Sequence, residues 1–231
     1  MNWGSEPVTR LNTQRYWTVH MEGNGQDLYI AGEERFGFFT SHGYSLSRII
    51  PTFRRFYTFV INDITNQKFS RIMDIGSGNG YVLAQVISRI SNATGFGIDP
   101  SPYMVRIGSR RAKRMGISNR ATFMMGSSHE IPIKDKFDII YSTMSFHHWS
   151  NREKAVTDIM QLLDENGKFM IYEASPRGGF NRKLVKAHLM DREDFISLSK
   201  KTGVPITEII ENGGFIRATF VNRSPTIPCS I

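Results

Sequence analysis

The stretch from residue 72 to residue 80, IMDIGSGNG, places an acid and three glycines at the end of an apolar run. Glycine lets the backbone turn sharply, and it lets a ligand approach the main chain closely. In an open parallel sheet, ligands bind outside the carboxyl ends of the strands, which is where such a loop would lie. The stretch is therefore predicted to be a ligand-binding loop, and Asp74 bears on which ligand it accepts.

Asp74 argues against a dinucleotide and for a ligand that carries positive charge. The dinucleotide fingerprint needs Gly-x-Gly-x-x-Gly, but counting from Gly76 and Gly78 the third position is Tyr81. Two unit charges about 4 Å apart interact by roughly 4 kcal/mol at an effective dielectric of about 20, so a carboxylate here would repel a pyrophosphate by part of that energy. S-adenosylmethionine carries an ammonium and a sulfonium group, and Asp74 matches it better than NAD.

A second acid, Asp99, follows the next apolar segment, TGFGI. A carboxylate at that place can accept hydrogen bonds from both hydroxyls of a ribose, which suits either cofactor. The alternative is that Asp99 only complements the positive end of the helix that follows it. Asp99 is thus a candidate for binding a ribose, but it does not distinguish S-adenosylmethionine from NAD.

The elements that must position these acids alternate along residues 69–173. Expected strands cover 71–75, 94–98, 121–125, 137–142 and 168–173, and expected helices cover 80–91, 101–115 and 151–163. Ser101 and Asn151 are the expected helix N-caps, and Glu165-Asn166-Gly167 is an expected turn. Such alternation predicts a parallel sheet with helices on both faces and right-handed crossovers.

The C-terminal part of the chain changes pattern. A helix is expected over 192–202, and two strands, 205–211 and 214–221, flank Asn212-Gly213, which is a hairpin signal. Residues 174–190 are expected to be a loop that runs into a basic helix. The predicted fold is therefore α/β, a doubly wound Rossmann-like sheet of seven strands, mostly parallel and ending in an antiparallel hairpin.

The first 68 residues are rich in glycines and aromatics and contain a predicted helix over 45–66, bent or interrupted at Pro51. We expect residues 1–68 to form a cap or lid segment over the strand ends and residues 69–231 to form the cofactor-binding domain. A plain packing helix is the alternative for the first segment.

Composition narrows the classes of protein. No apolar run reaches the roughly 18 residues that span a bilayer, and MNWGSEPVTR lacks the build of a signal peptide, so we expect a cytoplasmic protein. The single cysteine, Cys229, excludes a disulfide framework and a cysteine-rich metal site. The net charge of +8 permits anionic partners, including nucleic acid. One basic cluster is either a solvated helix face or a contact surface: Arg106, Arg110, Arg111, Lys113, Arg114 and Arg120.

Four blocks occur in a telling order: IMDIGSGNG, GIDPSPYM, GSSHEIPIKDKFDIIYSTMSFHHW and LLDENGKFMIYE. In this order they resemble class I S-adenosylmethionine-dependent methyltransferases, closest to the ubiquinone/menaquinone-biosynthesis type of small-molecule methyltransferase. The resemblance covers about residues 69–173 and implies S-adenosyl-L-methionine as cofactor and a Rossmann-like fold.

The resemblance also implies roles for single residues. Asp74, Gly76, Ser77 and Gly78 would surround the methionine part of the cofactor, and Asp99 would hold the ribose. Pro100 and Met104 would pack on the adenine ring. The remaining implied contacts are Ser127 and Ser128 beside the adenine, where the family often has Asp-Ala, and Ser142 and Thr143 near the sulfonium.

No catalytic dyad is evident, and methyl transfer needs a base only if the acceptor must lose a proton. The candidates for a catalytic role are Tyr16, His42, His147, Tyr172 and Glu173. Of the adjacent histidines, His147 is expected to line the pocket and His148 to pack or to start a helix; no metal site is expected. Motifs of the adenine-N6, cytosine-C5 and arsenite methyltransferases are missing, which favours a small-molecule acceptor. An RNA or ribosomal acceptor and a non-catalytic S-adenosylmethionine-binding partner subunit are the alternatives. The sequence does not indicate an oligomeric state.

Overall fold

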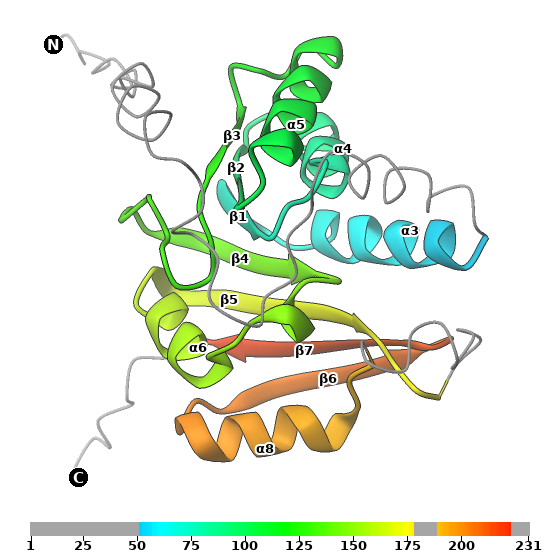
Figure 1. The fold of residues 1–231 in the computed structure, drawn as a ribbon, viewed down its shortest axis with the longest axis vertical. Coiled ribbons are helices and arrows are strands. Elements are labelled where there is room, and N and C mark those ends of the chain that lie inside the picture. The colour runs from blue at the N-terminus through cyan, green and yellow to red at the C-terminus, as the bar shows by residue number, and fades with distance from the viewer. Residues whose placement is uncertain (1–50, 178–188, 223–231) are drawn as a thin grey trace, which may run out of the picture.

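A computed structural model describes residues 51–177 and 189–222 of the chain. Seven strands form one sheet in the order β3-β2-β1-β4-β5-β7-β6 (Figure 1). The strands are β1 (Arg71–Ile75), β2 (Thr94–Asp99), β3 (Ala121–Met125), β4 (Phe137–Thr143), β5 (Leu163–Ala174), β6 (Ile206–Asn212) and β7 (Phe215–Val221). The helices are α3 (Pro51–Thr65), α4 (Tyr81–Arg89), α5 (Pro102–Arg114), the 3₁₀ turn η2 (Phe146–His148), α6 (Arg152–Met160) and α8 (Arg192–Thr202).

The pairing of the strands confirms the predicted fold class. β3, β2, β1, β4 and β5 run parallel, whereas β7 pairs antiparallel with both β5 and β6. The order of the parallel strands changes direction between β1 and β4, so a topological switch point lies where β1 ends. The glycine loop that follows β1 therefore lies where ligands bind in this class of sheet.

Two local expectations were displaced. β5 starts at Leu163, not at residue 168, and so contains the expected turn. Asn166 makes this possible, because it adopts a left-handed φ of 63° where the register between β4 and β5 shifts. Its N–H donates to the carbonyl of Asn222, which follows β7. The hairpin turn is centred on Gly213 and Gly214, one residue later than expected. Both have positive φ, as the tightest hairpin turn requires, and the flanking Asn212 and Phe215 pair directly.

The expected N-caps are in place at α5, which follows β2, and at α6, which follows β4. The Ser101 side chain accepts a hydrogen bond from the Met104 N–H at 3.5 Å, and Pro102 occupies the first helical position of α5. The Asn151 side chain accepts one from the Lys154 N–H at 3.1 Å and caps α6. Both caps fix where a helix begins beside the strand ends.

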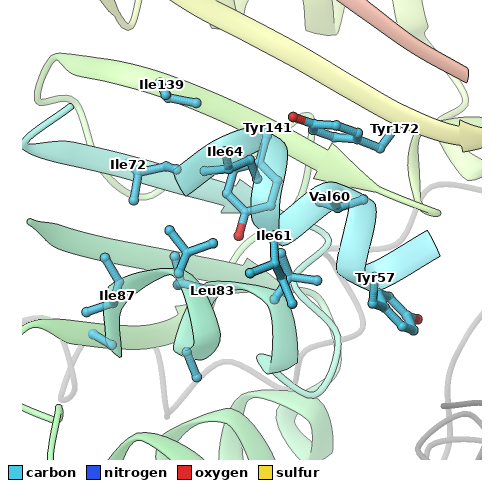
Figure 2. Close-up of a cluster of buried hydrophobic side chains, with 14 of the residues drawn as sticks. Tyr57, Val60, Ile61, Ile64, Ile72, Leu83, Ile87, Ile139, Tyr141 and Tyr172 are labelled. Atoms are coloured by element: carbon cyan, nitrogen blue, oxygen red, sulfur yellow. The ribbon is translucent and has the colours of Figure 1, made fainter. Parts of the chain in front are cut away.

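Apolar side chains fill both faces of the sheet. Helices α3, α4 and α5 cover one face, and α6, α8 and η2 cover the other (Figure 1). Figure 2 shows how α3 places Tyr57, Val60, Ile61 and Ile64 over the sheet and against Leu83 of α4. Four positions that recur at helical spacing are thus buried, and the described part of the predicted 1–68 segment belongs to the same core as the sheet. The domain boundary at residue 68 stays a prediction, and residues 45–50 of the predicted helix lie outside the described residues.

Polar contacts also attach α3 to the sheet. Arg217 of β7 is 3% exposed and donates from Nη1 to both carboxylate oxygens of Asp63, at 3.0 and 2.7 Å. The Tyr172 hydroxyl donates to the same carboxylate at 2.8 Å, and Glu208 pairs with the other arm of Arg217. Burial alone would lower the pKa of Arg217, but the charge of Asp63 raises it above its ordinary value. The side chain therefore stays charged inside the protein.

Phe123 of β3 packs against glycines at the start of α4, within β2 and in the middle of α5. A Cβ atom added to Gly80, Gly97 or Gly108 would come within 2.4–2.7 Å of the Phe123 ring. Non-bonded carbon atoms prefer about 3.5–4.0 Å, so these positions exclude any larger side chain while the ring stays in place. These glycines therefore let α5 and the glycine loop approach β2 and β3 closely.

None of the helices within 51–177 and 189–222 combines the length and the apolar character needed to cross a lipid bilayer.

Candidate cofactor and active site

A cavity lies at the carboxyl ends of β1, β2 and β4 and receives most of the predicted cofactor residues. Ten of the eleven line it: Asp74, Gly76, Ser77, Gly78, Asp99, Pro100, Met104, Ser127, Ser128 and Thr143. Ser142 does not line it. It lies one residue earlier on β4, is fully buried, and has no hydrogen-bond partner for its Oγ among the described residues. The role of each residue in binding remains a prediction, but the residues share one space.

Backbone hydrogen bonds hold the glycine loop against β2. The N–H groups of Gly76 and Ser77 both donate to the Ile98 carbonyl, each at 2.9 Å. Asp99 accepts from the Gly78 N–H at 2.8 Å and from the Ser101 N–H at 2.9 Å. Two main-chain donors thus orient the carboxylate, which keeps its remaining lone pairs for a ligand.

Gly76 is required for two separate reasons. Its φ is +74°, and a Cβ atom there would lie 2.0 Å from Ser145 Oγ. Gly78 has a similar φ of +52°, but a Cβ there would meet nothing within 4 Å.

The two glycines therefore make a matched pair for testing the close approach. Gly76→Ala is expected to destabilise the ligand-free protein by about 1–3 kcal/mol more than Gly78→Ala, because both carry the cost of a left-handed residue but only Gly76→Ala adds overpacking. Urea unfolding of both variants without cofactor measures the difference. Equal losses would mean that the Ser145 contact has no energetic weight.

Asp74 is a buried acid at the centre of this wall. It is 2% exposed, and its Oδ1 has no hydrogen-bond partner in the described part of the chain. Burial raises the pKa of Asp74 to about 8; the nearby Tyr141 hydroxyl opposes that rise without meeting strict hydrogen-bond geometry, and the charge of Asp99 adds to it. Burial also raises the pKa of Asp99, to about 6, against the lowering by the Ser101 and Gly78 N–H groups. A cationic ligand would favour the ionised form of both carboxyl groups.

Three unpartnered polar atoms belong to residues of the cavity wall. Ser77 Oγ and Thr143 Oγ1 are buried and, like Asp74 Oδ1, have no partner among the described residues. Buried polar groups in native proteins are almost always hydrogen-bonded, so these three atoms are available to the polar groups of a ligand in the cavity. One carboxylate and two hydroxyls fit the ammonium and carboxylate of an amino acid, which the methionine part of S-adenosylmethionine carries.

The segment after β4 closes the cavity with a strained turn. Met144 has a φ of +50°, an uncommon conformation for a residue with a side chain. The next residue, Ser145, lies against Gly76 and accepts a hydrogen bond from Trp149 Nε1 at 3.2 Å. Met144, Ser145 and Trp149 all line the cavity, although no motif in the sequence predicts a role for them. Backbone strain of this kind gathers at functional sites.

The two histidines exchange the places that the sequence suggested. His148 lines the cavity, whereas His147 does not and instead contacts Glu173 through its Nδ1 at 2.7 Å. Successive residues of a 3₁₀ turn point in different directions, about a third of a turn apart, and η2 contains both. The rings still touch, with centroids 3.9 Å apart.

The pair of His147 and Glu173 lies behind the cavity wall. Their side chains are 5% and 0% exposed, and the His147 N–H also donates to Glu173, at 3.3 Å. Arg152 donates to the His147 carbonyl at 2.5 Å. The arrangement holds η2, and with it His148, in a fixed position at the end of β5.

The other predicted catalytic residues lie elsewhere. Tyr172 is buried under α3, where it donates to Asp63, and it does not line the cavity. Tyr16 and His42 lie outside the described residues. Residues missed by the sequence analysis include Tyr57 of α3, Asn79 and Val82, which line the cavity with Tyr81, the residue in the place of the third dinucleotide glycine.

Of the two serines predicted to lie beside the adenine, Ser127 already hydrogen-bonds within its own loop. Ser127 Oγ lies 2.8 Å from His129 Nδ1 and accepts from the Glu130 N–H at 3.2 Å. Its hydroxyl is thus engaged by its own loop, while Ser128 also lines the cavity.

Among the described residues, no group of three His, Cys, Asp or Glu side chains is arranged to hold a metal ion.

Part of this chain is similar in sequence to known methyltransferases. Residues 72–167 match a family model described as a methyltransferase domain. The uncharacterized methyltransferase YcgJ of Bacillus subtilis is 30% identical over 104 residues, which are 45% of this chain and 40% of that protein. The chain thus spans less than half of the length of that curated relative.

The matched segment is less than half of the chain and is similar to a methyltransferase domain of the class I, Rossmann-like type, a similarity that implies S-adenosyl-L-methionine as cofactor. A SAM-dependent methyltransferase from Aquifex aeolicus superposes with a TM-score of 0.66 at 15% identity, covering 81% of this chain and 99% of that one. The [4+2]-cyclase SpnF superposes with a TM-score of 0.62 at 18% identity, covering 73% and 80%. Both likenesses concern the fold alone.

Proposed function

We propose that this chain is a methyltransferase that transfers the methyl group of S-adenosyl-L-methionine in line to a small-molecule acceptor. The observation that carries the proposal is the buried carboxylate of Asp74, left without a full set of partners in the same cavity as Asp99 and the glycine loop. The resemblance to the ubiquinone/menaquinone-biosynthesis type belongs to the proposal, as does a cytoplasmic location.

The chain's own groups hold the cofactor in this proposal. The cofactor supplies an electrophilic methyl group on a sulfonium, and the protein's task is to bind, orient and keep out water. Asp74 would hold the ammonium, and Asp99, which is oriented by two N–H groups, would accept hydrogen bonds from the ribose hydroxyls. Pro100 and Met104 offer an apolar surface for the adenine. Holding reactants in a productive geometry can supply up to about 7–11 kcal/mol of barrier lowering.

The side chains that remain in the cavity wall suit a small acceptor with an apolar body. Tyr57 and Tyr81 lie edge to face, with centroids 5.7 Å apart, while His148 and Trp149 belong to the segment after β4. Such a wall of rings with few polar groups is typical of small-molecule sites. His148 is then the group that accepts a proton if the acceptor must lose one, and Glu173 and His147 are positioning residues behind it.

The binding step can be tested without knowing the acceptor. S-adenosylhomocysteine at about 100 times its dissociation constant is expected to stabilise the protein by about 2.7 kcal/mol, because it binds only the folded state. For a chain of this size that corresponds to a rise in Tm of about 5–10 °C in calorimetry. NADH at the same concentration is the control and should leave Tm unchanged; stabilisation by NADH alone would reverse the assignment.

Turnover needs a second experiment. Methyl-labelled cofactor incubated with a metabolite extract is expected to label small molecules, and label in cell RNA instead would favour the RNA or ribosomal alternative. Binding without any labelled product would favour a non-catalytic cofactor-binding protein. One fold hosts unrelated activities, so the fold alone does not establish turnover.

A further inference from the structure

The solvent-facing side of α5 carries an aromatic ring and a row of cations. Tyr103 is the one large hydrophobic residue among those described that is clearly exposed, at 42%. Arg106, Arg110, Lys113 and Arg114 are exposed on the same helix, which contains no acidic residue. With 3.6 residues per turn, these five positions fall within about a third of the helix circumference. We call this surface the α5 basic face.

The structure divides the basic cluster of the sequence into two groups. Arg111 donates from Nε to the Asn79 carbonyl at 3.0 Å. Arg120 donates to three carbonyls in the last turn of α4 and in the segment that follows it. These two arginines have structural roles. The four cations of the α5 basic face have no ion pair or side-chain hydrogen bond with any described residue.

This face is costly for the helix that carries it. Arg106, Arg110 and Arg114 follow at intervals of four residues, and like charges at that spacing destabilise a helix. The negative end of the helix dipole favours Lys113 and Arg114, which lie in the last turn, but not Arg106 and Arg110 nearer the start. Fold stability therefore does not account for the two upstream arginines.

A groove runs beside the row. Its apolar part is formed by Pro102 and Val105 of α5 and by Met125 of the edge strand β3. Its charged rim is formed by Arg106, Arg110 and Lys113. Cations four residues apart on a helix are separated by about 6 Å along the axis, so the row extends beyond the reach of one phosphate. A ligand with repeated negative charge and an apolar component fits this surface.

We propose that the α5 basic face binds single-stranded nucleic acid. Arginine recognises phosphate oxygens with two parallel hydrogen bonds, and a cationic track beside an exposed aromatic ring is the pattern on which unpaired bases stack. Tyr103 provides that ring. An acidic peptide would use the cations but has no need of Tyr103, which is why the observations favour nucleic acid. The proposal does not depend on methyl transfer, because the face lies outside the cofactor cavity.

The test uses a fluorescently labelled 12-nucleotide oligo(U) and the full chain in anisotropy titrations at several salt concentrations. Arg106→Gln/Arg110→Gln is expected to weaken binding at least tenfold and to make the salt slope shallower by roughly 1.4, since each single-strand phosphate contact contributes about 0.7. Tyr103→Ala is expected to weaken binding at least fivefold with the slope unchanged. The matched control is Arg54→Gln/Arg55→Gln, which removes two exposed arginines from α3 and should leave affinity within twofold.

Other outcomes overturn the proposal. Equal losses in the two double variants would mean that the affinity reflects net charge alone. An unchanged affinity in Tyr103→Ala, together with equally tight binding of polyglutamate, would assign the face to an acidic protein partner. Competition by millimolar inorganic phosphate at constant ionic strength would reduce it to a single-phosphate site. Circular dichroism and S-adenosylhomocysteine binding of each variant separate these results from misfolding and from failure of the proposed function.

Discussion

Replacing Asp74 by asparagine is expected to weaken S-adenosylhomocysteine binding by about 1–3 kcal/mol, roughly 5- to 150-fold, while the protein stays folded. The variant keeps the shape of the side chain but removes the anion that faces the ligand's ammonium, and hydrogen bonds to charged groups are worth about twice those between neutral groups. Isothermal titration calorimetry at pH 8 measures the loss. Unchanged affinity in a well-folded variant would mean that Asp74 does not face the cation.

The same substitution is expected to stabilise the ligand-free protein at pH 8. The pKa of Asp74 is raised in the folded state, from 3.8 to about 8, so stability is greatest at low pH and is lost as the pH rises across that interval. Within the interval, a rise of one pH unit removes at most about 1.4 kcal/mol. We expect a gain of at least about 1 kcal/mol at pH 8 and little gain at pH 4, since asparagine avoids the buried charge. Site residues that lower stability in this way are common.

The pH dependence of binding provides a further readout of this prediction. Because the free carboxyl is largely protonated below its raised pKa, affinity for the ammonium is expected to rise between pH 6 and pH 8, by at most tenfold per pH unit. Asp74→Asn should flatten that slope. The control is Asp158→Asn, which removes an exposed partner of Lys154 and should alter neither affinity nor slope. A slope retained in Asp74→Asn would assign the titration to another group, such as Asp99.

Removal of Asp63 is expected to be among the most destabilising single changes on α3. Asp63→Ala removes the acceptor of both hydrogen bonds from Arg217 Nη1 and of the hydrogen bond from the Tyr172 hydroxyl. The Arg217 cation, which is 3% exposed, then keeps only the partly exposed Glu208 as an ion-pair partner. Breaking a buried pair from one side typically costs 3–5 kcal/mol. We expect about 3 kcal/mol in urea unfolding, because Asp63 itself is 18% exposed and water can enter.

A double variant distinguishes the lost pair from lost packing. Asp63→Leu/Arg217→Met replaces both charges by apolar groups of similar length and should recover most of the stability, since apolar replacements of buried ion pairs are often neutral. Asp158→Ala, which opens the exposed Lys154 pair, is the matched control and should cost less than about 1 kcal/mol. If the double variant is as unstable as Asp63→Ala, the pair is not the cause.

The strands of the parallel sheet could be read from the sequence because each is a short apolar run between turn residues. β1, β3 and the helix α8 lie at the expected residues, and the hairpin was displaced by only one position. The helix N-caps could also be predicted, because the side chains of Ser101 and Asn151 accept hydrogen bonds from N–H groups only three residues away. Features that depend on contacts within a few residues are recorded in local sequence.

The cofactor cavity was legible for a related reason. Its wall is made by residues at strand ends, and a parallel sheet brings the ends of β1, β2 and β4 to one edge. The expected elements and the switch-point rule therefore predict that Asp74 and Asp99 lie close together, whereas the place of Thr143 was implied by the family resemblance.

Contacts between distant segments were decided only by the tertiary structure. The sequence does not say that Arg217 meets Asp63 across 154 residues, that Tyr172 turns toward α3, or that Ser145 closes on Gly76. It also placed His147 in the cavity, where the 3₁₀ turn presents His148 instead. By itself the sequence determined the order of elements and the acids at their ends, because these follow from local periodicity. Whether a side chain faces the cavity or only supports the fold depends on the direction it takes from its helical turn and on packing across the sheet. Both are set by contacts between segments that are distant in the sequence.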